Sequence, residues 1–327
     1  MASVARVETV TSIVFPECSG GRKLRRGIVL PFAFAHQMCR TVKCDPVMNR
    51  ENSSYTICHH PHFAGTVAVV IPVRIEKARM KLSVVIITKN ESHCIGDCLR
   101  SVSFADEVIV LDSGSNDGTV DICRALGAKV EITDWPGFGP QKNRALGRAS
   151  GDWILSLDAD EKVSDALRED ILQAIGYGKF KIYSVPRLSS YLGRPMRHSG
   201  WWPDHVERLF QRGCARFSSD LVHEKLVFEG QLGFLRAHLE HEAFTSLEEV
   251  IDKLNRYSTA GAEMAQQRGR SSSLFLAILK GVVAFFRTYI VRAGFVDGRE
   301  GFMLAVSNAE GTYYRQLKLM FLNEKKA

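Results

Sequence analysis

The feature that most constrains the fold is a regular alternation of strand and helix patterns that begins at Met80. The run LSVVIIT (82–88) is continuously apolar and β-branched, which is typical of a strand buried on both faces. Further strand patterns follow, with helical patterns between them, and the alternation predicts an α/β fold with a parallel sheet. The expected strands are 82–88, 107–112, 129–134 and 153–158, and the expected helices are 92–104, 118–126 and 139–149.

Net charge is unevenly distributed along the 327 residues, whose formal charge is +7. Residues 1–79 contain 11 Lys and Arg and 5 acidic residues. Residues 80–327 contain the other 32 Lys and Arg and 31 acidic residues. A groove that follows nucleic-acid phosphates needs a clustered excess of positive charge. The nearly neutral body therefore predicts no nucleic-acid partner.

Residues 1–79 have no sustained helical or strand period, and we expect a poorly ordered extension or a mis-assigned translation start. The CHHPH run (58–62) suggests a metal site, but structural zinc sites need spaced ligand pairs that this segment lacks. The functional protein is expected to begin near Met80, and native peptides from upstream of it would contradict this. The eight cysteines form no disulfide framework and no signal peptide is evident, so we expect a reducing compartment.

Polar clusters follow three of the expected strands. Each could be a simple turn, because Asp, Asn, Ser and Gly favour turns for backbone reasons. Ligands of doubly wound sheets bind at the carboxyl ends of parallel strands, however, and three clusters on successive strand ends would converge there. The clusters are Thr88-Lys89-Asn90-Glu91, Asp112-Ser113-Gly114-Ser115 and Asp158-Ala159-Asp160-Glu161.

The closely spaced acids of the third cluster predict a divalent cation. Asp158 and Asp160 would direct two carboxylates toward one point, where Mg²⁺ or Mn²⁺ could join them to substrate phosphates. Lys142 and Arg144 lie near the start of the helix that begins around Pro140 and could add positive charge to its N-terminal dipole. The alternative for these two side chains is a solvated helix face.

The strand-end segments resemble those of the family 2 glycosyltransferases, which have the GT-A fold, Rossmann-like and mostly parallel. SVVIITKNE resembles the family's opening strand, LDSGSNDGT its second motif and LDADE its metal-binding Asp-x-Asp. Order and spacing agree from residue 80 to about 165. One departure is that the second motif usually has two adjacent acids, whereas Ser113 follows Asp112 here.

The resemblance implies roles for individual residues. Thr88, Asn90, Glu91 and Asp112 would hold the uridine of a UDP-sugar. Lys142, from its position near the start of the Pro140 helix, is also expected to bind the nucleotide sugar. Asp158 would contact the sugar or ribose, and Asp158, Asp160 and His241 are the expected Mg²⁺ or Mn²⁺ ligands, where the cation would neutralise the departing diphosphate.

The acceptor side is expected to be a β-rich part over residues 164–245. It completes a catalytic domain over 80–245, whose nucleotide-sugar part is 80–163. Inversion needs a general base on the acceptor hydroxyl, and a carboxylate is the usual choice. The candidates are Glu224 in VHEKL and, as the second choice, Asp204 in WWPDHVERLF. Trp201 and Trp202 are either a sugar-stacking platform or a core plug.

Over residues 80–327 the chain is similar to bacterial lipopolysaccharide-core β-1,4-glucosyltransferases. This implies glucose transfer from UDP-glucose to an inner-core heptose, by a cytoplasmic enzyme peripheral to the inner face of the inner membrane. The expected helical region 246–327 contains the segment 271–295, which is either an interfacial helix or a helix packed on the catalytic domain. Its strongly apolar run, 274–286, has 13 residues and is too short to span a bilayer.

Three rival interpretations remain. LDADEKV also resembles the nucleophile motif of haloacid-dehalogenase phosphatases, but that motif belongs on a first strand. A receiver-like binding domain needs paired acids after the first strand, where this chain has Thr88-Lys89-Asn90-Glu91. A polyprenyl-phosphate sugar transferase of the same fold would be favoured by C-terminal transmembrane helices, which the sequence pattern does not predict.

Overall fold

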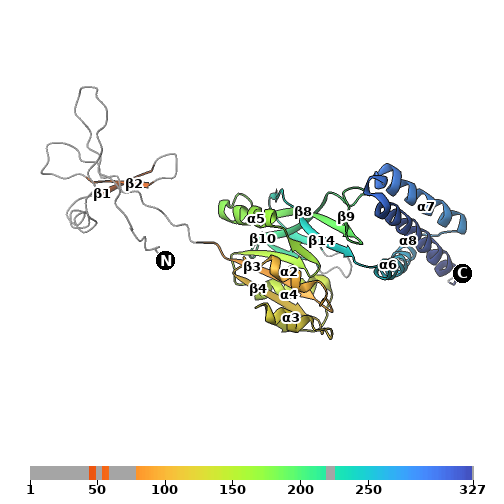
Figure 1. Cartoon of the computed structure of the whole chain (residues 1–327), viewed down its shortest axis with the longest axis horizontal. Coiled ribbons are helices and arrows are strands. Elements are labelled where there is room, and N and C mark those ends of the chain that lie inside the picture. The colour runs from red at the N-terminus through yellow and green to blue at the C-terminus, as the bar shows by residue number, and fades with distance from the viewer. Residues whose placement is uncertain (1–43, 49–53, 59–78, 219–224, 326–327) are drawn as a thin grey trace, which may run out of the picture. The chain divides into compact units, whose positions relative to one another are not determined.

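The computed structural model describes residues 44–48, 54–58, 79–218 and 225–325, and it divides the chain into the units Met1–Arg79 and Met80–Ala327 (Figure 1). In the first unit, β1 (Cys44–Met48) pairs antiparallel with β2 (Ser54–Cys58). The His residues of the CHHPH run lie outside the described residues. The second unit contains the predicted sheet together with all three polar clusters.

A mixed sheet of ten strands organises the second unit, in the order β5-β4-β3-β6-β10-β8-β14-β7, with β9 and β13 paired to β8. The four strands predicted from the sequence lie side by side and parallel at one end. The strands are β3 (Leu82–Thr88), β4 (Glu107–Asp112), β5 (Lys129–Ile132), β6 (Trp153–Asp158), β7 (Glu161–Val163), β8 (Ile182–Tyr191), β9 (Arg194–Pro195), β10 (Asp204–Gln211), β13 (Leu232–Phe234) and β14 (Leu239–Phe244), with a separate pair β11 (Ala215–Phe217) and β12 (Leu226–Phe228).

Both faces of the parallel strands are covered, which explains the unbroken apolar run of β3. Val84 and Ile86 pack with α2 (Ile95–Ser101), α3 (Thr119–Ala125) and α5 (Asp165–Tyr177), whereas Val85 and Ile87 pack with α4 (Phe138–Arg148). The parallel strands have helices on both faces and are continued by a mixed part, in which β10 is antiparallel to β6 and β8 while β13 and β14 are parallel to β8. This is the mostly parallel GT-A arrangement predicted from the sequence.

Two helices differ from the prediction. The first spans only Ile95–Ser101 rather than 92–104, because backbone bonds from Cys94 and Ile95 to the Glu91 carbonyl form a turn ahead of it. The second, α5, is absent from the predicted elements, although Ser164 caps its first turn by accepting from the Leu167 amide. The buried side chains of α5 recur at helical spacing and pack on the sheet: Leu167, Ile171, Ala174 and Ile175.

Three helices form the C-terminal part: α6 (Leu247–Gln267), α7 (Leu274–Phe286) and α8 (Gly298–Glu324), which pack together beyond β14 (Figure 1). The apolar run of the sequence ends at Phe286, but a π-helical turn over Arg287–Val291 continues the helix. Leu274–Val291 thus forms 18 helical residues with a mean hydropathy of 1.9, of which 17% are buried. By length and composition alone, this helix could cross a membrane, which corrects the prediction that the segment is too short.

Candidate active site

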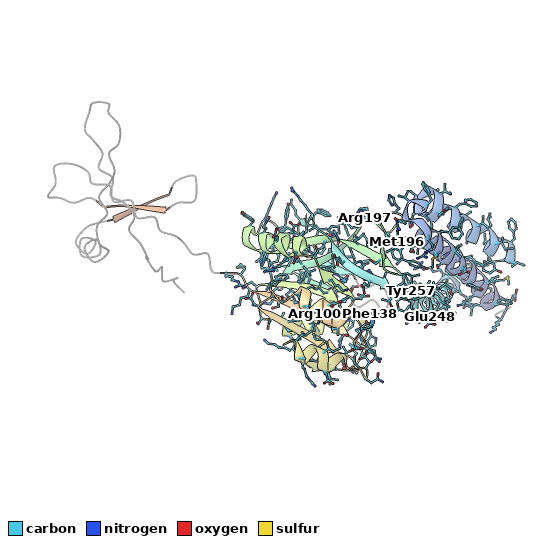
Figure 2. All side chains as sticks on the ribbon, viewed as in Figure 1. Arg100, Phe138, Met196, Arg197, Glu248 and Tyr257 are labelled. Carbon is cyan, nitrogen blue, oxygen red and sulfur yellow. The ribbon has the colours of Figure 1, made fainter. Side chains whose placement is uncertain are left out.

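The three polar clusters meet at one edge of the sheet, as predicted. Strand register places Thr88 beside Asp112 on one side, while Ile87 pairs with Asp158 on the other. This edge opens into a cavity of about 950 Å³, lined from α4, β6, β10, β14 and α6. Phe138 of α4 and Tyr257 of α6, both labelled in Figure 2, are among its lining residues.

Asp158, at the end of β6, lies between two cations. Lys142 Nζ is 2.9 Å from Asp158 Oδ1, and the Arg208 guanidinium donates to Oδ2. Burial would raise the pKa of the Asp158 carboxyl, but the charges of Arg208 and Lys142 outweigh it and hold this pKa well below its usual range. Asp158 is therefore a fixed carboxylate, which agrees with a role in holding a polar ligand.

Arg208, which is not among the site residues predicted from the sequence, also binds a second acid. Its guanidinium donates to Glu161 Oε1 at 2.6 Å, and Glu161 Oε2 accepts the Asp158 amide at 3.0 Å. Arg208 is 6% exposed and Glu161 is fully buried, so the pair is shielded from water. The triad of Asp158, Glu161 and Arg208 thus fixes the turn that carries Asp160.

Asp160 lies beside His241, which comes from β14. Asp160 Oδ2 and His241 Nε2 are 3.3 Å apart, and His241 Nδ1 is 2.8 Å from the Ser189 hydroxyl. With Nδ1–H donating to Ser189, Nε2 would be free to accept a cation, as second-shell partners of metal-binding histidines allow. One carboxylate and one imidazole on a shared point suit Mn²⁺ or a similar divalent ion, so these residues fit the predicted metal.

Asp204, one of the two base candidates, lines the cavity and is tied to Arg187. Arg187 donates to Asp204 Oδ2 from Nε at 3.0 Å and from a terminal nitrogen at 2.6 Å. Both bonds use one oxygen, and Oδ1 makes no hydrogen bond within the described part of the chain. The other candidate, Glu224, lies outside the described residues.

The first two strand ends build a loop platform next to the cavity. The Asp112 carboxylate is buried and accepts the amides of Gly114 and Ser115 at 2.9 and 2.8 Å, so it shapes its own loop rather than lining the cavity. Asn90 Oδ1 accepts the Asn116 amide at 3.0 Å and joins the two loops. Thr88 lines the cavity, and its buried hydroxyl has no hydrogen-bond partner among the described residues, which suits a ligand contact.

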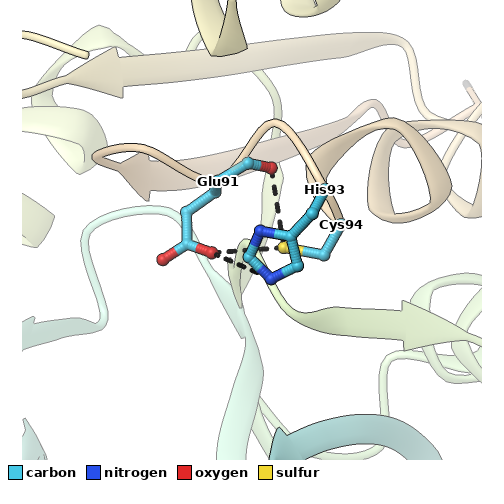
Figure 3. Close-up of side chains that lie close together, drawn as sticks. All are labelled: Glu91, His93 and Cys94. Carbon is cyan, nitrogen blue, oxygen red and sulfur yellow. Dashed lines mark hydrogen bonds and ion pairs between the residues drawn. The ribbon is translucent and has the colours of Figure 1, made fainter. Parts of the chain in front are cut away.

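Glu91 lies in a small cluster with His93 and Cys94 (Figure 3). The Cys94 thiol donates to Glu91 Oε2 at 3.2 Å, and His93 Nε2 is 3.9 Å from the same oxygen. Burial, the thiol bond to Glu91 and nearby acids raise the pKa of the Cys94 thiol, whereas a metal-binding thiol must be deprotonated. Burial raises the Glu91 pKa too, and the Asp160 charge adds to this effect. Of the three residues in this cluster, Glu91 alone lines the cavity.

The remaining predicted residues divide between the site and its surroundings. Lys142 is buried against Asp158, whereas Arg144 pairs with Asp134 at 2.7 Å on the exposed helix face. The Trp201 ring lines the cavity and also stacks on Phe244, with centroids 6.2 Å apart. Trp201 therefore serves both as a cavity wall and as part of the core, while Trp202 contacts His238 edge-on.

Comparison with known proteins identifies the class. The sequence model described as "Glycosyl transferase family 2" matches residues 83–223. An uncharacterized glycosyltransferase of Rickettsia prowazekii (strain Madrid E) is 31% identical over 258 residues, which cover 75% of this chain and 88% of that protein. The chain belongs to glycosyl transferase family 2 and is an enzyme of that class.

Two further relatives are similar to parts of the chain. The lipopolysaccharide core biosynthesis glycosyltransferase LpsC of Rhizobium meliloti (strain 1021) is 29% identical over 257 residues, covering 74% of this chain and 92% of LpsC. A crystal structure of glucosyl-3-phosphoglycerate synthase from Mycobacterium tuberculosis with Mn²⁺ and UDP covers 36% of this chain and 46% of its own, with 30% identity and a TM-score of 0.30.

Proposed function

We propose that this enzyme transfers glucose, with inversion, from UDP-glucose to a heptose of the lipopolysaccharide inner core, assisted by Mg²⁺ or Mn²⁺. One observation carries the proposal: the Asp160 carboxylate and the His241 imidazole lie 3.3 Å apart, where both could bind one cation. They lie beside the Asp158 carboxylate in a cavity of about 950 Å³. The similarity to LpsC supports the acceptor class.

The chain's own residues have separate tasks in this reaction. A bound divalent cation, held by Asp160 and His241, would supply Lewis-acid neutralisation of the leaving diphosphate. Asp158 accepts hydrogen bonds from hydroxyl groups of the UDP-sugar. Lys142 and Arg208 keep its carboxylate ionised and hold it in place for this role. The Thr88 hydroxyl binds the nucleotide part, and Asn90, Glu91 and Asp112 hold the loops around it.

Asp204→Asn is expected to lower kcat by about 10²–10⁴-fold, the usual contribution of a positioned general base. Asp204 Oδ1 is free to accept the acceptor proton while Arg187 holds Oδ2. Turnover is measured by acceptor-dependent UDP release, and the UDP dissociation constant should be unchanged. The matched variant is Glu224→Gln: a collapse of kcat in Glu224→Gln with normal turnover in Asp204→Asn would assign the base to Glu224 instead.

We further propose that the enzyme binds the membrane surface through its C-terminal helices. The exposed apolar side chains of α7 and the turns after it include Phe275, Phe286 and Val291, which are 75%, 55% and 78% exposed. Residues 268–299 contain six Lys and Arg and one acid, which suits anionic headgroups. A lipid-linked acceptor would require such contact.

Phe275→Ser combined with Val291→Ser should weaken binding to vesicles of anionic phospholipid by roughly tenfold or more, since each buried apolar side chain contributes about 1.5–3 kcal/mol. Co-sedimentation measures the bound fraction. Tyr177→Ser is the control, because Tyr177 is 82% exposed on α5, away from this surface. Equal losses in the double variant and in Tyr177→Ser would contradict the assigned surface.

A second candidate function is sugar transfer to a polyprenyl phosphate, and the span-length helix Leu274–Val291 favours it. Extraction of membranes with alkaline carbonate separates the two cases. Release of the protein supports a peripheral enzyme, whereas retention together with UDP release driven by polyprenyl phosphate would support the alternative.

A further inference from the structure

A second hollow lies beside the active-site cavity. It has a volume of about 290 Å³ and is formed by the ends of β8 and β14 with α6 and α8. Trp201, Phe244, Lys253 and Tyr257 line both spaces, so the hollow opens from the same wall as the catalytic cavity. Ligand pockets have volumes from about 300 Å³ upward, so this hollow is at the lower end of the range and suits one sugar ring.

The lining of this hollow combines aromatic rings with short polar side chains. The aromatic residues are Trp201, Tyr257 and Phe244, and the Phe244 ring stacks on that of Trp201. The polar side chains are Ser258, Ser307, Asn308 and Thr312. Rings that cover the apolar face of a ligand, with hydroxyls and amides at its edge, suit a saccharide better than a wholly apolar molecule.

The charge of the hollow differs from that of the catalytic cavity. Four carboxylates line the catalytic cavity, from Glu91, Asp158, Asp160 and Asp204, whereas the second hollow is lined by Lys253 and Arg315 and by no acid of the described chain. Lys253 Nζ donates to the Ala243 carbonyl at 2.8 Å and lies over the Phe244 ring. Lys253 also lies close enough to Glu91 and Glu249 for its charge to lower the pKa of both carboxyls. Arg315, which is exposed on α8, makes no ion pair with a described residue and is therefore the cation of the hollow that is available to an anionic ligand.

Arg315 reaches the hollow across a glycine. A Cβ placed on Gly261 of α6 would lie 2.8 Å from Arg315 Cδ, so the absence of a side chain there lets the arginine cross between α6 and α8. Guanidinium groups bind phosphate and carboxylate through paired hydrogen bonds, which makes Arg315 suited to an anionic substituent on a sugar.

We propose that this hollow is an acceptor subsite that binds an anionic sugar residue, phosphorylated or carboxylated, next to the sugar that is glycosylated. This inference rests on the proposed transfer to a saccharide acceptor. Arg315 binds the anionic group, Lys253 adds charge at the boundary with the catalytic cavity, and Trp201 stacks on the sugar ring between them.

Binding of core oligosaccharide tests the subsite directly. The full-length enzyme, with UDP and Mn²⁺ present, is titrated by calorimetry with oligosaccharide released from lipopolysaccharide in native, dephosphorylated and carboxyl-reduced forms. Arg315→Gln should weaken binding of the native form roughly tenfold, as expected for loss of one charge-assisted pair. The difference in affinity between the wild type and Arg315→Gln should disappear for the oligosaccharide form from which the bound anionic group has been removed, as in a double-mutant cycle. Loss of the difference on dephosphorylation identifies a phosphate, and its loss on carboxyl reduction identifies a carboxylate.

Two further variants separate charge from fold. Gly261→Ala keeps the charge of Arg315 but should displace its side chain. It should therefore weaken binding of the native oligosaccharide, as Arg315→Gln does. Arg236→Gln, an exposed arginine outside the hollow, is the matched control and should bind normally. Unchanged binding in Arg315→Gln, or an equal loss with all three oligosaccharide forms, would overturn the subsite. Absence of UDP release by the wild type would overturn the proposed function, while the binding result would still decide the subsite.

Discussion

Arg208→Met is expected to lower the free energy of unfolding by about 3–5 kcal/mol, the usual cost of removing one partner from a buried ion pair. Methionine retains much of the side-chain volume but leaves the Glu161 carboxylate, which is fully buried, with Arg187 at 3.3 Å as its remaining described cation. Urea unfolding of the full-length protein at neutral pH measures the loss.

Arg148→Met is the matched control for this prediction. Arg148 forms a pair with Glu131 at a similar distance, 2.7 Å, but the pair is on the exposed surface, where it should contribute little. If Arg208→Met unfolded at the same urea concentration as Arg148→Met, the buried triad of Asp158, Glu161 and Arg208 would not be what stabilises the turn that carries Asp160.

His241→Ala is expected to weaken Mn²⁺ binding by about a hundredfold, because His241 is a proposed direct ligand and the loss of an outer-shell partner alone typically costs about 10–100-fold. Ser189→Ala should weaken it less, since Ser189 only orients the ring through the 2.8 Å contact with Nδ1. The titration of Mn²⁺ by its electron paramagnetic resonance signal, with UDP present, measures binding without requiring turnover.

His205→Ala controls for the loss of a histidine from this part of the sheet. His205 is exposed on β10, where its ring contacts Phe234 edge-on. The proposed metal site requires normal Mn²⁺ binding in His205→Ala. Equal Mn²⁺ affinity in His241→Ala and the wild type would instead remove His241 from that site.

The parallel half of the sheet is predictable from the sequence because its signals are local. The apolar run of β3 and the polar residues after each strand can be recognised from residues adjacent in the sequence. Parallel pairing of the strands then brings Thr88, Asp112 and Asp158 to one edge. Lys142 is predictable for the same reason, because a lysine in the first turns of the helix after β5 can reach that edge.

The partners from the mixed half of the sheet are not predictable in the same way. Arg208 and Arg187 lie on β10 and β8, and only the strand order β6-β10-β8 places them beside Asp158 and Asp204. No local pattern encodes that order, although an arginine within the buried end of a strand is a signal that a buried acid lies opposite. The extension of α7 is not evident from the sequence, because Arg287 interrupts the apolar run.

The most direct test of the proposed reaction is UDP release by the full-length enzyme with Mn²⁺, a panel of UDP-sugars and heptose-containing core lipid as acceptor. We expect acceptor-dependent release from UDP-glucose that Asp160→Ala abolishes, since Asp160 is the carboxylate placed beside His241. The absence of UDP release with every UDP-sugar, from a folded protein that binds Mn²⁺, would contradict the proposed donor.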